Sequence, residues 1–142
     1  MPVVALVLGI GLFVVACLVD LGRALVCLAG LQSAADAAAL AGASAVYVRV
    51  EVDGRGRVYD QEAYLDEDEA TSRAMSVLNL NIDDMVRGVD DISVKRKEVE
   101  IEEPFRVNVL VEADVRLQLL QAFLGIGEMR LGRRAGGEYR PQ

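Results

Sequence analysis

The sequence predicts an α+β protein in which a long N-terminal helix precedes a small antiparallel sheet and a short amphipathic helix. Three observations support this fold class: an uncharged apolar run at the N-terminus, an alanine-rich segment without proline after it, and alternating apolar and polar residues further on. Residues 1–45 are expected to form the hydrophobic helix, and residues 46–142 an α+β domain.

Charge is segregated along the 142 residues. Up to Val48 the charged side chains are Asp20, Arg23 and Asp36, whereas the whole chain has 22 acidic and 15 basic residues. An acidic soluble part argues against a nucleic-acid partner, because phosphates attract Lys and Arg. The chain has no histidine, which excludes Ser-His and Cys-His nucleophile systems, so we expect neither an enzyme nor a cofactor.

The apolar run covers residues 2–19 and contains no charged side chain. Its length is close to the roughly 20 residues that a helix needs to cross a bilayer. A core helix of a soluble domain is less favoured, because such helices are seldom apolar all round for so long. A cleaved secretory signal is also less favoured, since no basic residue precedes the run. We therefore expect a membrane anchor in contact with lipid.

The helix is predicted to continue past the membrane. Asp20 and Arg23 are three residues apart and are expected to pair on one helical face. From Val3 to Ala45 the helix would measure ~65 Å, about twice the bilayer thickness, so its outer half must pack against something else.

A helical projection separates this outer half into two sides. Gln32 and Asp36 lie on one side, and a seam of mostly small residues lies on the other: Cys27, Leu31, Ala34, Ala38, Ala41 and Ala45. Small side chains let helix backbones approach closely. The seam is compatible with dense packing of many like helices in a fibre, and equally with a stalk lying on its own soluble domain.

Two strings in this region carry a family resemblance, VDLGR at residues 19–23 and LQSAADAAALAGA at residues 31–43. They resemble the N-terminal signature of the TadE/TadG-like family, pilin-like proteins of the bacterial tight-adherence (Flp) pilus machinery within the type IV pilin superfamily. The resemblance implies a long helix against a small sheet, and a single pass through the cytoplasmic membrane with the C-terminal domain outside, or a place in the extracellular pilus. It also implies self-association, or association with other pilin-like subunits, through the N-terminal helix.

The chain departs from processed pilins in two respects. Pilin precursors have a basic leader before the apolar run, whereas Met1 lies directly before Pro2 here, and Ala5 stands where processed pilins favour Glu. Two expectations follow: either the start codon lies further upstream, or no prepilin peptidase processes this member. A membrane-anchored binding protein that never enters a filament is therefore the alternative function.

The soluble part begins with a predicted hairpin and a helix. Residues 46–59 alternate around Asp53-Gly54, which favours a tight turn, although the long helix could instead run to about Val50. Asp66 and Glu69 have the spacing of a capping box, so a short amphipathic helix is expected over residues 66–80.

Strands dominate the remainder. Apolar residues at alternate positions predict strands over residues 98–102 and 105–117, with a possible preceding strand at Ile92 and Val94. Pro104 is expected to interrupt ladder pairing. A short helix or turn over residues 119–124 and a last strand over residues 129–139 complete the sheet.

A cluster of Asn and Asp residues and two charged patches could each have a functional or a purely structural role. The spacing of four polar residues resembles that of a calcium-binding EF-hand loop: Asn79, Asn81, Asp83 and Asp90. The Gly that such a loop requires is missing, so a polar connecting loop is favoured. Residues 60–103 are strongly acidic and residues 115–142 are basic. These patches could set the register between subunits, or neutralise each other within one chain.

Overall fold

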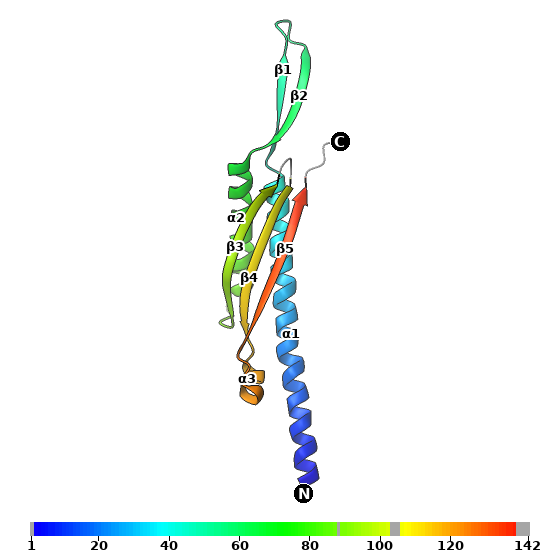
Figure 1. Ribbon diagram of the computed structural model, residues 1–142, viewed down its shortest axis with the longest axis vertical. Helices are drawn as coiled ribbons and strands as arrows, with labels where there is room; N and C mark the ends of the chain where they lie inside the picture. Colours follow the sequence, from blue (N-terminus) through cyan, green and yellow to red (C-terminus); the bar gives the residue numbers. More distant parts are fainter. Residues whose placement is uncertain (1, 88, 103–105, 139–142) are drawn as a thin grey trace.

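A computed structural model describes residues 2–87, 89–102 and 106–138 of the chain (Figure 1). A long helix, α1, extends from the N-terminus beside the sheet and ends below the β1–β2 hairpin (Figure 1). The other two helices and the five strands follow it in the chain. This confirms the predicted α+β class. In chain order the elements are α1 (Pro2–Ala43), β1 (Val46–Val52), β2 (Val58–Leu65), α2 (Glu67–Val86), β3 (Ile92–Glu102), β4 (Arg106–Arg116), α3 (Gln118–Leu124) and β5 (Glu128–Glu138).

Helix α1 is continuous through the level of Gly22 and Gly30, as predicted. Its C-terminal half packs against α2, β4 and β5, whereas its N-terminal half extends beyond the sheet (Figure 1). The core between these elements consists of small alanines on α1 facing α2 and valines on β4. Alanine suits this face of α1 because its small side chain lets both α2 and the sheet pack close to the helix backbone.

Two glycines lie where neighbouring elements approach each other closely in this core. A Cβ at Gly42 would lie 2.9 Å from Val107 Cγ1 and 3.1 Å from the Ala70 oxygen. A Cβ at Gly137 of β5 would overlap the backbone of Ala39 on α1. The backbone of β5 is therefore in direct contact with α1, and neither position has space for a side chain.

Strands β3, β4 and β5 form one antiparallel sheet in that order, with β4 in the centre. The alternation predicted for β4 is confirmed, because Val107, Val109, Val111 and Ala113 are all fully buried. The separate strands predicted at Ile92 and at residues 98–102 are wrong. Both belong to the single strand β3, in which an irregularity between Val94 and Arg96 shifts the pairing. Pro104 and Phe105 lie outside the described residues.

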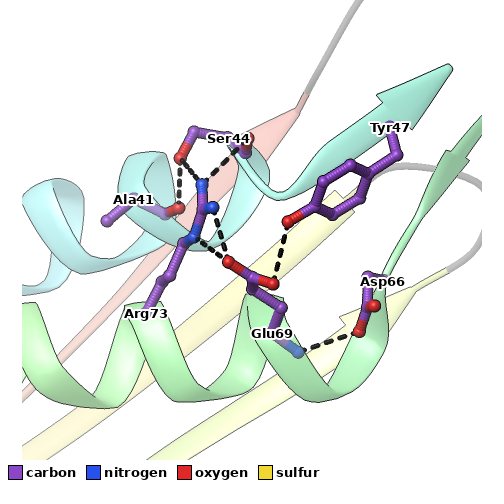
Figure 2. A network of polar contacts seen from close by, with 6 residues as sticks. All are labelled: Ala41, Ser44, Tyr47, Asp66, Glu69 and Arg73. Atoms are coloured by element: carbon purple, nitrogen blue, oxygen red, sulfur yellow. Dashed lines mark hydrogen bonds and ion pairs between the residues drawn. The ribbon is translucent and has the colours of Figure 1, made fainter.

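Helix α2 begins as the capping signal predicts. Asp66 is the N-cap, and its Oδ1 accepts a hydrogen bond of 3.0 Å from the backbone N–H of Glu69 (Figure 2). The predicted end at residue 80 is wrong, because the helix continues to Val86. Ile82 supplies one more buried turn after Leu78, and this additional turn packs on α1.

The β1–β2 hairpin projects past the C-terminal end of α1 (Figure 1). Asp53 organises the turn, since its Oδ1 accepts hydrogen bonds from the backbone N–H groups of Arg55 and Arg57. The hairpin prediction is confirmed, and a helix reaching Val50 is wrong because α1 ends at Ala43. Val48, Val50 and Val52 lie on one face of the ribbon and are exposed.

Candidate functional site

The N-terminal half of α1 is apolar and mostly exposed, although one side of it is buried at Ala16 and Asp20. Leu6, Leu8, Ile10, Leu12 and Leu18 are each more than half exposed. Within the described residues, α1 is the one helix long and apolar enough to cross a membrane. These large exposed apolar side chains suit lipid or other apolar helices far better than water.

Asp20 lies at the end of this apolar stretch and points into the protein. Its side chain is 1% exposed, and Oδ2 accepts a hydrogen bond of 2.7 Å from the backbone N–H of Leu120. Helix α3 lacks a capping side chain of its own at Leu117. Asp20 therefore caps α3 from a different element, which satisfies a backbone donor that the helix cannot satisfy itself.

The predicted pair between Asp20 and Arg23 is wrong. Arg23 instead forms an ion pair with Asp91, which precedes β3, and Asp91 also accepts a hydrogen bond of 2.7 Å from the side-chain amide of Gln118. Three-residue spacing permits a local pair, but each side chain has a partner in the soluble domain. The amide of Gln118 and the guanidinium of Arg23 lower the pKa of Asp91.

An open, mostly apolar cavity of about 520 Å³ lies between α1 and the base of the sheet. Val19, Gly22 and Val26 line it from α1, and Met85 and Val115 line it from the domain. Arg23 and Asp91 form its polar edge. We call Asp20, Arg23, Asp91, Gln118 and Leu120 the basal junction, because together they join α1 to the lower end of the domain.

The predicted seam faces the chain's own domain. Cys27, Leu31, Ala34, Ala38 and Ala45 are each at most 4% exposed, and Ala41 is partly buried. Of the two interpretations, a stalk lying on its own domain therefore describes these residues. Gln32 and Asp36 lie outside the seam, and the Gln32 amide donates a hydrogen bond of 2.9 Å to Asp36.

A second polar network fixes the opposite end of α1 (Figure 2). The Tyr47 hydroxyl of β1 donates a 2.8 Å hydrogen bond to Glu69 of α2, and the Arg73 Nε donates one of 2.9 Å to the same carboxylate. Arg73 also reaches the Ser44 carbonyl at the end of α1. The hydrogen bond to Glu69 raises the pKa of Tyr47, and the bonds from Tyr47 and Arg73 lower the pKa of Glu69. The Glu69 carboxylate thus joins β1 to α2, and Arg73 of the same network connects α2 to the residue that follows α1.

The loop predicted at residues 79–83 is wrong, both as a calcium-binding loop and as the favoured polar connection, because these residues belong to α2. Asn79 accepts from Lys97 and Asn81 donates to the Val77 carbonyl. No group of three or more metal-ligating side chains occurs within the described part of the chain.

Oppositely charged side chains of the two patches meet within the sheet. Arg134 pairs with Glu100 at 2.8 Å, and Arg130 pairs with Asp114 at 3.0 Å. The first pair joins the basic patch to the acidic one, so at least this contact is neutralised within the chain. A role for the patches between subunits stays a prediction.

Sequence reasoning missed three members of the basal junction: Asp91, Gln118 and Leu120. The sequence offers one sign of this site: no charged residue occurs between Arg116 and Glu128. That absence identifies an unusual segment, but it does not show that the segment contacts Asp20. The contact of Asp20 with a residue one hundred positions later has no short-range signature.

Comparison of the chain with known proteins gives a match for its N-terminal segment. No curated protein and no solved structure matches the chain significantly. A family model described as "Putative Flp pilus-assembly TadE/G-like" matches residues 1–45, which contain α1 and end just before β1 begins at Val46. The resemblance seen in the sequence is therefore confirmed for this segment, and the chain is similar there to proteins of Flp pilus assembly.

Proposed function

We propose that the protein is a pilin-like structural component of a Tad/Flp-type pilus system, acting through packing of α1 rather than through catalysis. The observation that carries the proposal is the division of α1 into a largely exposed apolar half and a half that buries one face against the chain's own domain. Because the chain's own domain covers the seam, other subunits would bind the remaining surface of α1.

That remaining surface is mostly apolar, with polar positions at Gln32, Ser33 and Asp36. Leu25 is 65% exposed and Val26 is 75% exposed, although both lie at the level of the folded domain. Leu40 is exposed near the end of the same helix. Isolated exposed leucines are ordinary, but an apolar helix surface as long as that of residues 3–19 is expected to be covered. Lipid covers residues 3–19 before assembly, and like helices replace it afterwards.

In this proposal the domain from β1 to β5 lies outside the cytoplasmic membrane and α1 crosses the membrane once. The match to a pilus-assembly family over residues 1–45 supports this arrangement. The polar partners of Asp20 and Arg23 support it as well, since they bind the domain to the helix at the end of the apolar stretch.

A second candidate function is a single-pass anchored binding protein that stays outside filaments. The exposed valine face of the β1–β2 ribbon favours it, because an isolated two-stranded hairpin is marginal in water and gains stability from a partner.

Immunogold electron microscopy separates the two functions. Surface filaments would be sheared from the bacterium that carries this chain and probed with antibody against residues 46–138. Regular labelling along filaments is expected for a structural subunit. Labelling that remains with the membrane fraction, in cells with normal filaments, would favour the anchored binding protein.

A further inference from the structure

We infer that α3 and the turn after it form a second membrane contact, inserted into the lipid leaflet that adjoins the soluble domain. The inference deepens the proposed function and rests on its claim that α1 spans the membrane. It starts from composition: residues 117–127 contain no charged side chain, although Arg116 and Glu128 flank them directly.

The segment exposes large apolar side chains at one tip. Phe123, Leu124 and Ile126 are each about half exposed (51%, 55% and 50%), and Leu119 is 40% exposed. The side chain of Leu120 faces inward and is buried. Four large apolar side chains on an eleven-residue segment with no charge form a surface that water does not favour.

The position of this tip along α1 identifies its partner. Helix α3 packs on α1 below the sheet (Figure 1), and the rings of Phe13 and Phe123 make an edge contact with centroids 5.8 Å apart. Phe13 precedes Asp20 by seven residues, which places this contact ~10 Å further toward the N-terminus along the helix axis. The tip therefore lies beside the uncharged run of α1, and whatever surrounds that run also surrounds the tip.

Part of the backbone of the segment is hydrogen-bonded within the chain, which lowers the cost of contact with lipid. Irregular backbone is tolerated in hydrocarbon only where its polar groups are satisfied internally. Here Leu117 N–H donates to the Gly127 carbonyl, Gly125 N–H donates to the Gln121 carbonyl, and Asp20 accepts from Leu120. The turn closes on itself through Gly125, whose φ of 71° lies in the left-handed region.

Charged side chains mark the water side of the segment. Arg116 and Glu128 lie directly above it and face each other at 4.0 Å, and the Arg23–Asp91 pair is attached to α3 through Gln118. Lipid headgroups are therefore expected at the level of these side chains, with acyl chains around Phe123 and Leu124.

Tryptophan fluorescence of the full chain in vesicles tests the inference, because the protein contains no tryptophan. Leu124→Trp and Ile126→Trp would be placed in vesicles of phosphatidylethanolamine and phosphatidylglycerol with brominated acyl chains. Leu12→Trp serves as the control within the spanning run, and Val50→Trp as the control on the distant ribbon. The expected result is quenching of both α3 variants to an extent comparable with Leu12→Trp, whereas Val50→Trp is quenched by aqueous iodide.

The other outcomes overturn the inference in distinguishable ways. If Leu12→Trp is quenched by lipid and the α3 variants are quenched by iodide, the segment lies in water while the anchor stands. If the α3 variants are shielded from both quenchers, another copy of the chain covers the tip instead of lipid. If Leu12→Trp is itself unaffected by brominated lipid, the spanning helix and this inference both fail.

Discussion

The carboxylate of Asp20 on α1 accepts a 2.7 Å hydrogen bond from the backbone N–H of Leu120, one hundred residues later in the chain. The contact attaches α3 to the one charged position at the end of the apolar run. It gives Asp20 a structural role within a single subunit, independent of any partner.

Removing this cap should loosen α3. Asp20→Ala leaves the Leu120 N–H buried without an acceptor, which is expected to cost roughly 1–2 kcal/mol. Amide hydrogen exchange of residues 118–124, in detergent or nanodiscs, should accelerate accordingly. Asp20→Asn keeps an acceptor oxygen and should retain much of the protection. Asp36→Ala is the matched control, because Asp36 is exposed on the same helix. Unchanged exchange at Leu120 in Asp20→Ala would show that the cap is unimportant.

Close packing of β5 on α1 should make Gly137 intolerant of any side chain. Gly137→Ala drives a Cβ into the Ala39 backbone and is expected to destabilise the fold by about 1–3 kcal/mol. Gly132→Ala on the same strand is the control, since its nearest neighbour would be Glu112 Cγ at an ordinary 3.4 Å. Thermal unfolding followed by circular dichroism compares them, and equal melting temperatures would contradict the observed contact.

The basal junction should respond to acid. The pKa of Asp91 lies below the ordinary 3.8, chiefly because Gln118 donates to it and also because Arg23 is near. A lowered folded-state pKa means that the contribution to stability is present above pH 3.8 and is lost as pH falls through the lower, folded value. Carboxyl carbon NMR should show Gln118→Ala raising the pKa of Asp91. Gln32→Ala, which removes the partner of Asp36, should leave Asp91 unaffected, and an unshifted Asp91 in Gln118→Ala would refute the assignment.

Tyr47 reports on the network at the other end of α1. Its pKa is raised above 10.0 mainly by the hydrogen bond to Glu69, so its contribution is present below pH 10.0 and is lost as pH rises through the folded value. Glu69→Ala should lower the pKa of Tyr47 toward 10.0 in an ultraviolet titration of phenolate absorbance. Glu67→Ala removes a neighbouring acid of the same helical turn and is the control. A phenol that titrates identically in both variants would mean that the hydrogen bond is absent in solution.

Local patterns predicted the elements whose causes are local. The alternation of β4, the turn at Asp53 and the cap at Asp66 each depend on residues within a few positions, and all three appear as expected. The length of α2 was missed because four of the six residues 79–84 are Asn or Asp, and their helical state depends on packing of Ile82 and Met85 against the core. Strand β3 was divided in error because its pairing shifts between Val94 and Arg96, where the alternation is lost.

The candidate site was predicted only in part. The sequence singled out Asp20 and Arg23, but it assigned them to each other, since helical spacing is visible and tertiary distance is not. The seam was identified by its small residues, whereas its occupant was left open, because alanines that face a sheet and alanines that face another subunit look alike in sequence. Only coordinates reveal that Ala35, Ala38 and Ala39 are covered by the chain itself.

Photo-cross-linking in piliated cells tests the central claim most directly, namely that the free surface of α1 contacts other pilus subunits. A photoreactive residue would be placed at Val26, with Val50 on the ribbon as the comparison site. We predict that Val26 forms covalent adducts with a second copy of the chain or another pilin-like subunit, identified by mass spectrometry. Adducts from Val50 alone, with none to protein from Val26, would contradict the claim and favour an anchored binding protein.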